Sequence, residues 1–326
     1  MIGPLVVLLC MKDYANVAYS YQQALRSVGV NTVAFSSMKA GLKYPQTAEH
    51  FRYNQGSLSA ANPNQRNVFE ACKKAKVIIW MHSQYVDLGL PRNEINKKKL
   101  IVFHGGTSYR LKYNSLNRVF NPMVEISLIQ TLDLWGLGAK NQVWMLPAVD
   151  TDILKPTFQP MRRRRIIAHY PHVPIFKGSD IVIRALNTIE SSPDLVNKFE
   201  CKYSDTPVSW SENIERMRGC DIYIESLSRT TTWNQHDWSV TALEAAALGK
   251  IVVTNMLEPG RYKREYGFCA LHIANTENQL VNVLRKLLMI ESDAEIQRLK
   301  SVSREWVVKT HGYRAIGLKL KKILGV

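Results

Sequence analysis

The 326-residue sequence has few cysteines and no long apolar run. Its five cysteines lie far apart and form no Cys-x-x-Cys pair, which argues against a disulfide framework and against a cysteine-based zinc site. The opening apolar run, 4–11, has only eight residues before Lys12 and Asp13, too few to span a membrane, and no cleavage-site pattern follows it. We therefore expect a cytoplasmic protein with reduced thiols.

The sequence is also poor in acidic residues. Lys and Arg number 43 against 27 Asp and Glu, a formal charge of +16 that favours nucleic acid, nucleotide phosphates or an acidic membrane surface as partner. Basic runs occur at 96–99, 161–165 and 318–322 and form no single stripe, so a solvated surface is the simplest interpretation of each. Charge alone does not choose among these partners, and it is the only argument for nucleic acid. A membrane contact would be peripheral.

Short β-rich apolar runs alternate with amphipathic segments along the whole chain, a pattern typical of an α/β fold with parallel sheets. Prolines and charges interrupt the alternation at 153–162. We therefore expect two Rossmann-like domains, 1–152 and 163–305, joined by a linker over 153–162. The expected strands are 4–11, 31–37, 76–82, 100–106 and 142–148, followed by 165–171, 199–204, 221–226 and 250–255.

Ligands of open α/β sheets bind beyond the carboxyl ends of the strands, so these ends supply the candidate site residues. Two such sheets facing each other would gather them in one interdomain cleft suited to a nucleotide-linked small molecule. The candidates are Asp13 to Asn16, His82, His104 to Gly106, Pro147 to Asp150, His169 to His172, and Ser226 to Trp238.

Two segments of the second half carry the strongest chemistry. Lys177 and Gly178 come directly before a helix, where a lysine beside free helix amides makes a good diphosphate site. Glu244 lies one turn inside the expected helix 239–248, from which a carboxylate can accept hydrogen bonds from sugar hydroxyls. The simpler alternatives are an ordinary surface lysine and a solvated helix face.

Three motifs together resemble the retaining glycosyltransferases of family 4, which have the GT-B fold of two facing Rossmann-like domains with parallel sheets and an interdomain cleft. The motifs are PAVDTDILKP, HYPHVPIFKGSDIVIRAL and HDWSVTALEAAALGKIVVT, in the family's order and spacing. The resemblance implies that 1–152 is the acceptor-side domain, that 163–305 binds the nucleotide sugar, and that a last helix, about 306–326, crosses back to the first domain.

The resemblance also implies roles for individual residues. Lys177 would bind the donor diphosphate, Glu244 the nucleotide ribose, and His104 would lie near the donor sugar. The amides of Ser239, Val240 and Thr241 would lie near the phosphates. Gly178, Trp238 and Asn16 complete the expected donor site.

The sequence departs from the family pattern at two positions. His236 replaces the family's first glutamate, which contacts the donor sugar, and Asp237 beside it is the candidate substitute. His172 stands where the family often has an arginine, and we include it among the catalytic candidates. The DTD run at 150–152 resembles a metal-binding pair, but GT-B enzymes typically neutralise the diphosphate with basic side chains and amides, so we expect no metal and no cofactor.

The sequence thus predicts a retaining hexosyltransferase that transfers a sugar from a nucleotide sugar to a glycan or other hydroxyl acceptor. GDP-mannose is slightly favoured as donor and UDP-glucose comes next. One alternative is a sugar-nucleotide epimerase or hydrolase of similar fold, and another is a DNA-glycosylating or nucleic-acid-binding protein.

Overall fold

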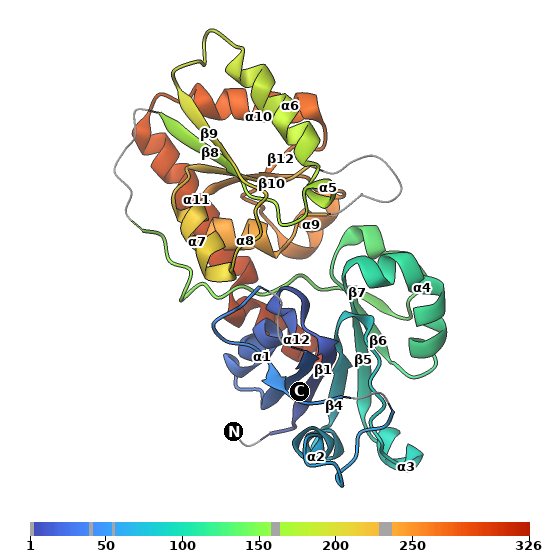
Figure 1. Ribbon diagram of the computed structural model, residues 1–326. Helices are drawn as coiled ribbons and strands as arrows, with labels where there is room; N and C mark the ends of the chain where they lie inside the picture. The colour runs from blue at the N-terminus through green and yellow to red at the C-terminus, as the bar shows by residue number, and fades with distance from the viewer. Residues whose placement is uncertain (1–2, 39–41, 54–55, 158–163, 228–236) are drawn as a thin grey trace. The chain divides into compact units, whose positions relative to one another are not determined.

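Two parallel β-sheets organise the computed structural model, which describes residues 3–38, 42–53, 56–157, 164–227 and 237–326 (Figure 1). Unit 1 comprises Met1–Ala148 together with Gly312–Val326, and unit 2 comprises Val149–His311. The boundary between the units therefore falls a few residues before the expected linker. Residues 306–311, which we expected in the first domain, are part of the last helix of unit 2.

Unit 1 contains a seven-stranded sheet of order β3-β2-β1-β4-β5-β6-β7, whose strand pairs are all parallel. Its strands are β1 (Val6–Lys12), β2 (Thr32–Met38), β3 (Glu49–His50), β4 (Val77–Trp80), β5 (Lys99–His104), β6 (Ile126–Ile129) and β7 (Gln142–Trp144). Its helices are α1 (Val17–Arg26), α2 (Arg66–Lys74), α3 (Arg92–Ile95), α4 (Gly106–Phe120) and α12 (Tyr313–Leu324). Alternate apolar residues of β1, β4 and β5 pack against α2 and α4 in one continuous core.

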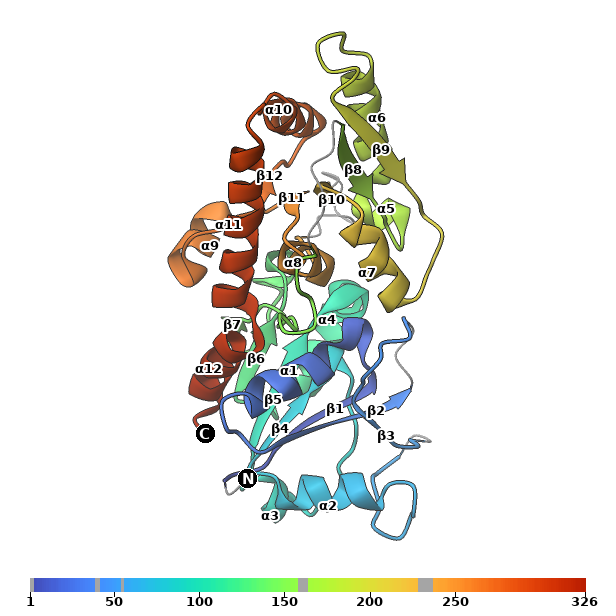
Figure 2. The same cartoon turned by 90° about the vertical axis from the view of Figure 1, so that its left-hand side faces the viewer.

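Unit 2 contains a five-stranded parallel sheet of order β12-β11-β10-β8-β9. Its strands are β8 (Arg165–His169), β9 (Phe199–Tyr203), β10 (Ile222–Ser226), β11 (Ile251–Thr254) and β12 (His272–Ile273). Its helices are α5 (Pro174–Lys177), α6 (Ser179–Glu190), α7 (Trp210–Arg218), α8 (Val240–Ala247), α9 (Pro259–Tyr266), α10 (Glu277–Leu288) and α11 (Asp293–His311). Helices α6 and α10 share the core on one face of the sheet, and α8 packs against α11 (Figure 2).

The start of the expected linker is attached to unit 2. Arg304 on α11 donates hydrogen bonds to the carbonyl oxygens of Leu154 (2.5 Å) and Thr151 (2.5 Å), and Leu154 is buried. Arg218 donates to the carbonyl oxygen of Lys155 at 2.8 Å. The remainder of the expected linker, 158–162, lies outside the described residues. Its first part, 153–157, is thus fixed to one unit.

Helix α12 contacts α1 closely in unit 1 because Gly317 has no side chain. A Cβ at Gly317 would lie 2.0 Å from the carbonyl oxygen of Ala24, an atom of the α1 backbone that has no rotamer to escape into. The close approach lets Ile316 and Leu320 of α12 bury completely. Glycine is therefore required at 317 by packing between helices.

We predict that Gly317→Ala destabilises unit 1 although alanine is the better helix former. The gain in helix propensity is about 1 kcal/mol, and forcing a methyl group against the Ala24 carbonyl costs about 1–3 kcal/mol, so we expect a net loss of up to about 2 kcal/mol. Denaturant unfolding measures it. Gly260→Ala in α9 is the control, because its Cβ would meet only Arg264, at 3.8 Å, and equal effects of the two substitutions would contradict the packing argument.

Candidate functional site

The carboxyl edge of the unit 2 sheet contains an ion pair between the partly exposed Lys177 and the buried Glu225. The Lys177 ammonium also donates to Ser239 Oγ at 2.9 Å, and Ser239 Oγ donates to Glu225 Oε1 at 2.7 Å. The other carboxylate oxygen accepts from Ser226 Oγ (2.5 Å) and Thr254 Oγ1 (2.8 Å). The cluster joins the end of α5, the ends of β10 and β11 and the start of α8.

These contacts keep Glu225 ionised. Burial opposes ionisation, but the Lys177 charge and the hydrogen bonds from Lys177, Ser226 and Ser239 outweigh it and lower the pKa of Glu225 to about 2. Lys177 keeps a side-chain exposure of 22% while Glu225 has none. The cation is thus the member of the pair that a ligand can reach.

Gly178 permits the turn that positions Lys177. Its φ is +61°, in the left-handed region, and a Cβ there would lie 1.9 Å from the carbonyl oxygen of Leu227. The Leu227 amide donates to the Lys177 carbonyl at 3.0 Å, which ties this turn to the end of β10. Only glycine fits at this position.

Helix α8 begins beside the Lys177 ammonium. Ser239 is its N-cap, but the Ser239 hydroxyl bonds to Glu225 and makes no capping bond to the helix amides. Ser239, Val240 and Thr241 are half-buried, and the first amides of any α-helix lack intrahelical acceptors. An ammonium group and the positive end of a helix dipole therefore lie side by side, a favourable arrangement for an anion.

Glu244 is buried in α8, one turn from this point. Its Oε1 accepts a hydrogen bond of 2.7 Å from Trp210 Nε1, at the start of α7. Burial raises the pKa of Glu244 to about 7, although the Trp210 bond and the Lys177 charge act in the opposite direction. A solvated helix face does not describe this residue, which is only 6% exposed.

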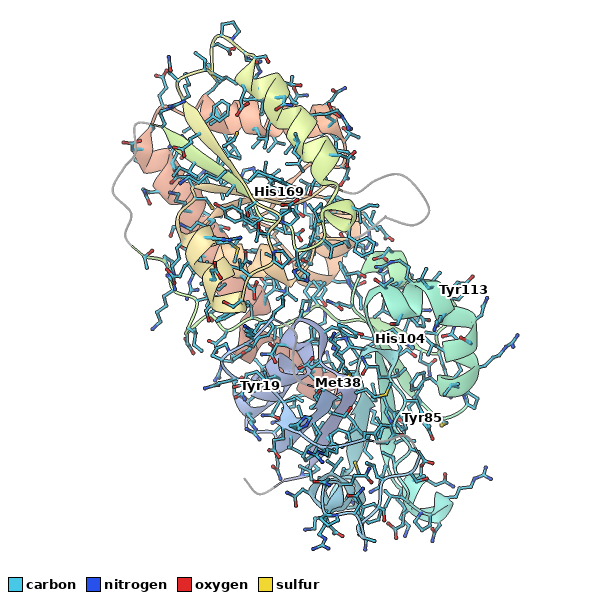
Figure 3. All side chains as sticks on the ribbon, in the orientation of Figure 1. Tyr19, Met38, Tyr85, His104, Tyr113 and His169 are labelled. Atoms are coloured by element: carbon cyan, nitrogen blue, oxygen red, sulfur yellow. The ribbon has the colours of Figure 1, made fainter. Side chains whose placement is uncertain are left out.

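His169 is the last residue of β8 and lies at the same carboxyl edge (Figure 3). Its Nδ1 is 2.8 Å from the Ile224 carbonyl oxygen, which can only accept, so Nδ1 carries the proton and Nε2 accepts from Ser179 Oγ at 2.9 Å. Burial lowers the pKa of His169 to about 4, so the ring stays neutral at physiological pH. It links β8, β10 and α6.

The other expected residues of unit 2 are placed differently. His172 is exposed in the loop between β8 and α5. Asp237 is buried, and its Oδ1 accepts from the backbone amide of Leu257 at 3.3 Å. The Trp238 indole lies in an aromatic cluster with Tyr262, Trp306 and His311. His236 lies outside the described residues.

His104 ends β5 in unit 1 and is fully buried (Figure 3). Its ring stacks on Tyr109 with centroids 3.8 Å apart, and its Nδ1 is 2.8 Å from Ser83 Oγ. Nε2 has no hydrogen-bond partner among the described residues. Burial lowers the pKa of His104 to about 3, so the neutral ring offers a hydrogen bond rather than a charge.

The neighbouring strand ends of unit 1 form strained turns. Ala15, Asn16, His82 and Ser83 all have φ between +51° and +58°, which non-glycine residues rarely adopt and which often occurs in active sites and ligand-binding turns. Asp13 stabilises the first turn by accepting from the amide of Ala18 at 2.9 Å, and its Oδ1 is 3.1 Å from His82 Nε2. The Asn16 Oδ1 atom is buried and has no partner among the described residues.

Among the described residues, no group of three His, Cys, Asp or Glu side chains could hold a metal ion, and Asp150 of the DTD run accepts from the amides of Asp152 and Ile153, both at 3.0 Å.

No helix in the described parts of the chain combines the length and apolarity needed to cross a membrane.

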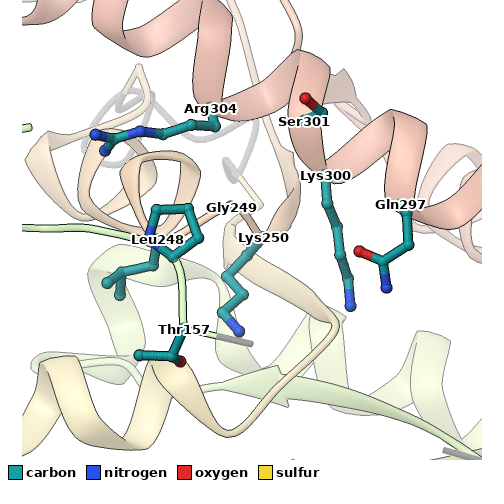
Figure 4. A pocket seen from close by; sticks show the side chains of 9 residues that line it. Thr157, Leu248, Gly249, Lys250, Gln297, Lys300, Ser301 and Arg304 are labelled. Atoms are coloured by element: carbon teal, nitrogen blue, oxygen red, sulfur yellow. The ribbon is translucent and has the colours of Figure 1, made fainter. Parts of the chain in front are cut away.

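A separate cavity of about 300 Å³ in unit 2 lies between the 156–157 segment and α11 (Figure 4). Its basic side chains already hold the protein together. Lys250 donates to the Arg218 carbonyl at 2.7 Å, Lys300 pairs with Asp221 at 2.6 Å, and Arg304 binds the backbone carbonyls described above. The basic side chains that line this cavity are therefore explained by their structural contacts.

Sequence reasoning missed Glu225. The signal was present, because a glutamate near the end of the apolar strand 221–226 must be buried and therefore needs a cation close by. Lys177 is that cation, but it lies 48 positions away, and only the fold brings the two together.

No protein-family model and no curated protein sequence matches this chain. Its backbone is nevertheless similar to solved structures over nearly its whole length. Anabaena HepE in complex with UDP-glucose has 13% identity and a TM-score of 0.61, covering 98% of this chain and 99% of that one. Sucrose-phosphate synthase from Thermosynechococcus elongatus has 13% identity and a TM-score of 0.59, covering 98% of both chains.

A third similar structure is an α-glucosyltransferase in complex with UDP and a 13-mer DNA, with 11% identity and a TM-score of 0.65, covering 99% of this chain and 100% of that one. At these identities the similarity concerns the fold. The α/β fold class predicted from the sequence is confirmed, and the chain has the GT-B fold of two Rossmann-like units with parallel sheets.

We predict that Glu244 makes stability depend on pH. Its pKa is about 7 in the fold against an ordinary 4.5, so the fold prefers the protonated form and raising the pH from 4.5 to 7 costs stability. Relative to Glu244→Gln, the wild-type protein should lose on the order of 3 kcal/mol across this window and little below it. Denaturant unfolding of both proteins at several pH values tests this, and a constant difference would mean that Glu244 is solvated.

Proposed function

We propose that the protein is a nucleotide-sugar-dependent glycosyltransferase. The observation that carries the proposal is the arrangement at the carboxyl edge of unit 2, where the Lys177 ammonium, the start of α8 and the buried Glu244 adjoin one another. A cation and free helix amides fit a diphosphate, and a carboxylate one turn further along fits ribose hydroxyls. The GT-B fold of the chain agrees with this use.

In this proposal unit 2 binds the donor and unit 1 binds the acceptor. Lys177 and the amides of Ser239, Val240 and Thr241 hold the diphosphate, and the turn at Gly178 keeps the lysine in place. Ionised Glu244 accepts from the ribose. Because its pKa is about 7, donor affinity should rise as the pH rises through neutrality.

For the donor we now favour UDP-glucose over GDP-mannose. Similar structures contain UDP or UDP-glucose, as in the HepE complexes. Mannosyl transfer from GDP-mannose is the second option. The acceptor is proposed only as a glycan or another hydroxyl compound.

We further propose that transfer retains the anomeric configuration, as in the family 4 enzymes that the motifs resemble. The leaving diphosphate would help to deprotonate the acceptor hydroxyl, and the protein would position the reactants and stabilise the leaving charge. His104 would contribute through the hydrogen-bonding capacity of its Nε2. Its low pKa makes it neutral, which excludes a role as a cationic acid near pH 7.

The usual first glutamate is absent from the proposed donor site. We keep Asp237 and His236 as candidate sugar contacts, with Asn16 from unit 1 and exposed His172 as further candidates. The buried Trp238 ring, packed in the aromatic cluster, would hold the neighbouring Asp237 in position. Measuring donor affinity after substitution of each of these residues would show which of them contact the donor.

We predict different kinetic signatures for Lys177 and Glu244. Lys177 acts most strongly on the charge that develops on the departing diphosphate, so Lys177→Ala should cost about 3 kcal/mol of transition-state stabilisation, mainly in kcat. Glu244 binds a ribose that changes little during reaction, so Glu244→Gln should mainly raise the KM for the donor. Steady-state kinetics with donor calorimetry measures both effects.

The ion pair between Lys177 and Glu225 makes a control variant necessary. Lys177→Ala alone leaves Glu225 buried without its cation, which by itself destabilises the protein. The double variant Lys177→Ala with Glu225→Gln removes this penalty while keeping the diphosphate site without its lysine. If the double variant regained turnover along with stability, Lys177 would have a structural role only.

A donor panel tests the proposed function as a whole. Calorimetry with UDP-glucose, GDP-mannose, UDP and GDP should reveal one preferred nucleotide. Product analysis with and without an acceptor mixture then distinguishes transfer from the alternative of an epimerase or hydrolase, which needs no acceptor. Absence of binding to every nucleotide would overturn the proposal.

A further inference from the structure

The positive charge of the protein is concentrated in unit 1. This unit contains 21 Lys and Arg against 7 Asp and Glu, a formal charge of +14. Unit 2 contains 22 against 20, a formal charge of +2. The excess that appears scattered along the sequence therefore belongs almost wholly to the unit that does not carry the Lys177 site.

Within unit 1, three basic segments far apart in the sequence meet at the amino edge of the sheet. The Lys98 ammonium donates to the carbonyl oxygens of Lys73 (2.7 Å) and Ala75 (2.9 Å) at the end of α2. The Lys99 ammonium donates to the carbonyl oxygens of Ile323 (3.0 Å) and Leu324 (3.2 Å) at the end of α12. The starts of β4 and β5 and the ends of α2 and α12 thus adjoin (Figure 2).

We call this surface the amino-edge basic surface. It consists of Lys73, Lys74, Lys76, Lys97, Lys98, Lys99, Lys321 and Lys322. Among the described residues of unit 1, the ion pairs are His82 with Asp13 and Arg110 with Asp133, so none of these lysines pairs with a carboxylate.

Helix capping explains only part of this surface. Lysines in the last turns of α2 and α12 interact favourably with the helix dipoles. Lys99 also binds the end of α12, whereas the ammonium groups of Lys76 and Lys97 donate to no helix carbonyl among the described residues. Glu94 attracts the Lys98 charge without pairing with it, so the eight lysines keep a net positive charge and repel one another, and an anionic partner would relieve this repulsion.

The composition of the surface favours lipid headgroups over nucleic acid. All eight side chains are lysines, and arginine is the residue whose planar fork suits bidentate phosphate and base recognition. The exposed tyrosines of unit 1, Tyr14 and Tyr85, follow the carboxyl ends of β1 and β4, so neither can stack bases here. Clusters of four to eight lysines are typical of surfaces that bind anionic lipids.

We propose that the amino-edge basic surface docks the protein reversibly on an anionic lipid bilayer. The carboxyl edge of the same sheet, where β5 ends at His104, lies at the opposite ends of the strands, so docking through the amino edge does not cover it. Lysines without an inserted apolar group give electrostatic adsorption that high salt reverses. The inference stands on charge and geometry and does not depend on the proposed activity.

Vesicle co-sedimentation tests the proposal with the full chain. We expect binding to phosphatidylcholine vesicles that contain about 30% phosphatidylserine, release at high salt, and no binding to pure phosphatidylcholine. The variant Lys73→Glu, Lys74→Glu, Lys97→Glu should lower the partition coefficient by at least about tenfold. These three side chains are exposed, and Lys98 and Lys99 keep their contacts with backbone carbonyls.

The matched control places the same charge change in unit 2. Lys263→Glu, Lys286→Glu, Lys309→Glu alters three exposed lysines outside the surface and gives the same net charge, so it should retain most of the binding. Equal losses in both variants would mean that overall charge alone drives adsorption. The proposal would be overturned if the first variant bound the vesicles as strongly as the wild-type protein, or if the wild-type protein did not bind them.

A parallel binding experiment with duplex DNA tests nucleic acid as the alternative partner. If a duplex of about 20 base pairs bound more tightly than the vesicles and the first variant abolished that binding, the surface would serve nucleic acid and the lipid proposal would fail. Circular dichroism melting establishes that each variant is folded. A Lys→Gln version of the first triple replaces it if charge reversal prevents folding, with the same expected direction.

Discussion

The ion pair between Lys177 and the buried Glu225 is the interaction on which the carboxyl edge of unit 2 depends. Removing a carboxylate from water is costly, and the cost is recovered only when pairing and hydrogen bonds are complete. Here the carboxylate is satisfied by Lys177 and by three hydroxyl groups from two strand ends and a helix start. Segments far apart in the sequence are thereby fixed at one point.

The same edge contains two glutamates whose pKa values differ because their surroundings differ. Glu225 and Glu244 are both buried, yet the pKa of the first falls to about 2 and that of the second rises to about 7. The difference follows from partners, since Glu225 contacts the ammonium group directly whereas Glu244 has the neutral indole of Trp210. One carboxylate is therefore a fixed charge, and the other is poised to respond to pH or to a ligand.

The sequence predicts most of this fold because its strands are buried on both faces and appear as continuous apolar runs. The strands β3 and β12 escape prediction because each has two residues, and β6 is short and bounded by polar residues. Lys177 and Glu244 were identifiable from local helix context, and their roles stay predictions. Glu225 was not identified, because a charged residue inside a strand becomes meaningful only with its partner.

The charge distribution shows the same limit of sequence reasoning. The runs at 96–99 and 318–322 are separated by more than two hundred residues, and each alone looks like an ordinary solvated segment. They converge because α12 returns to unit 1 and because parallel strands begin at a common edge. Convergence of this kind depends on topology and leaves no local trace.

The discontinuity of unit 1 affects how the protein is made. Helix α12 leaves the ribosome only after the whole of unit 2, so the face of α1 around Ala24 must wait for its partner while 163 intervening residues are synthesised. Unit 2 is continuous in sequence and can fold first as an uninterrupted segment. During that interval the nascent first unit exposes the apolar surface of α1 that α12 later covers.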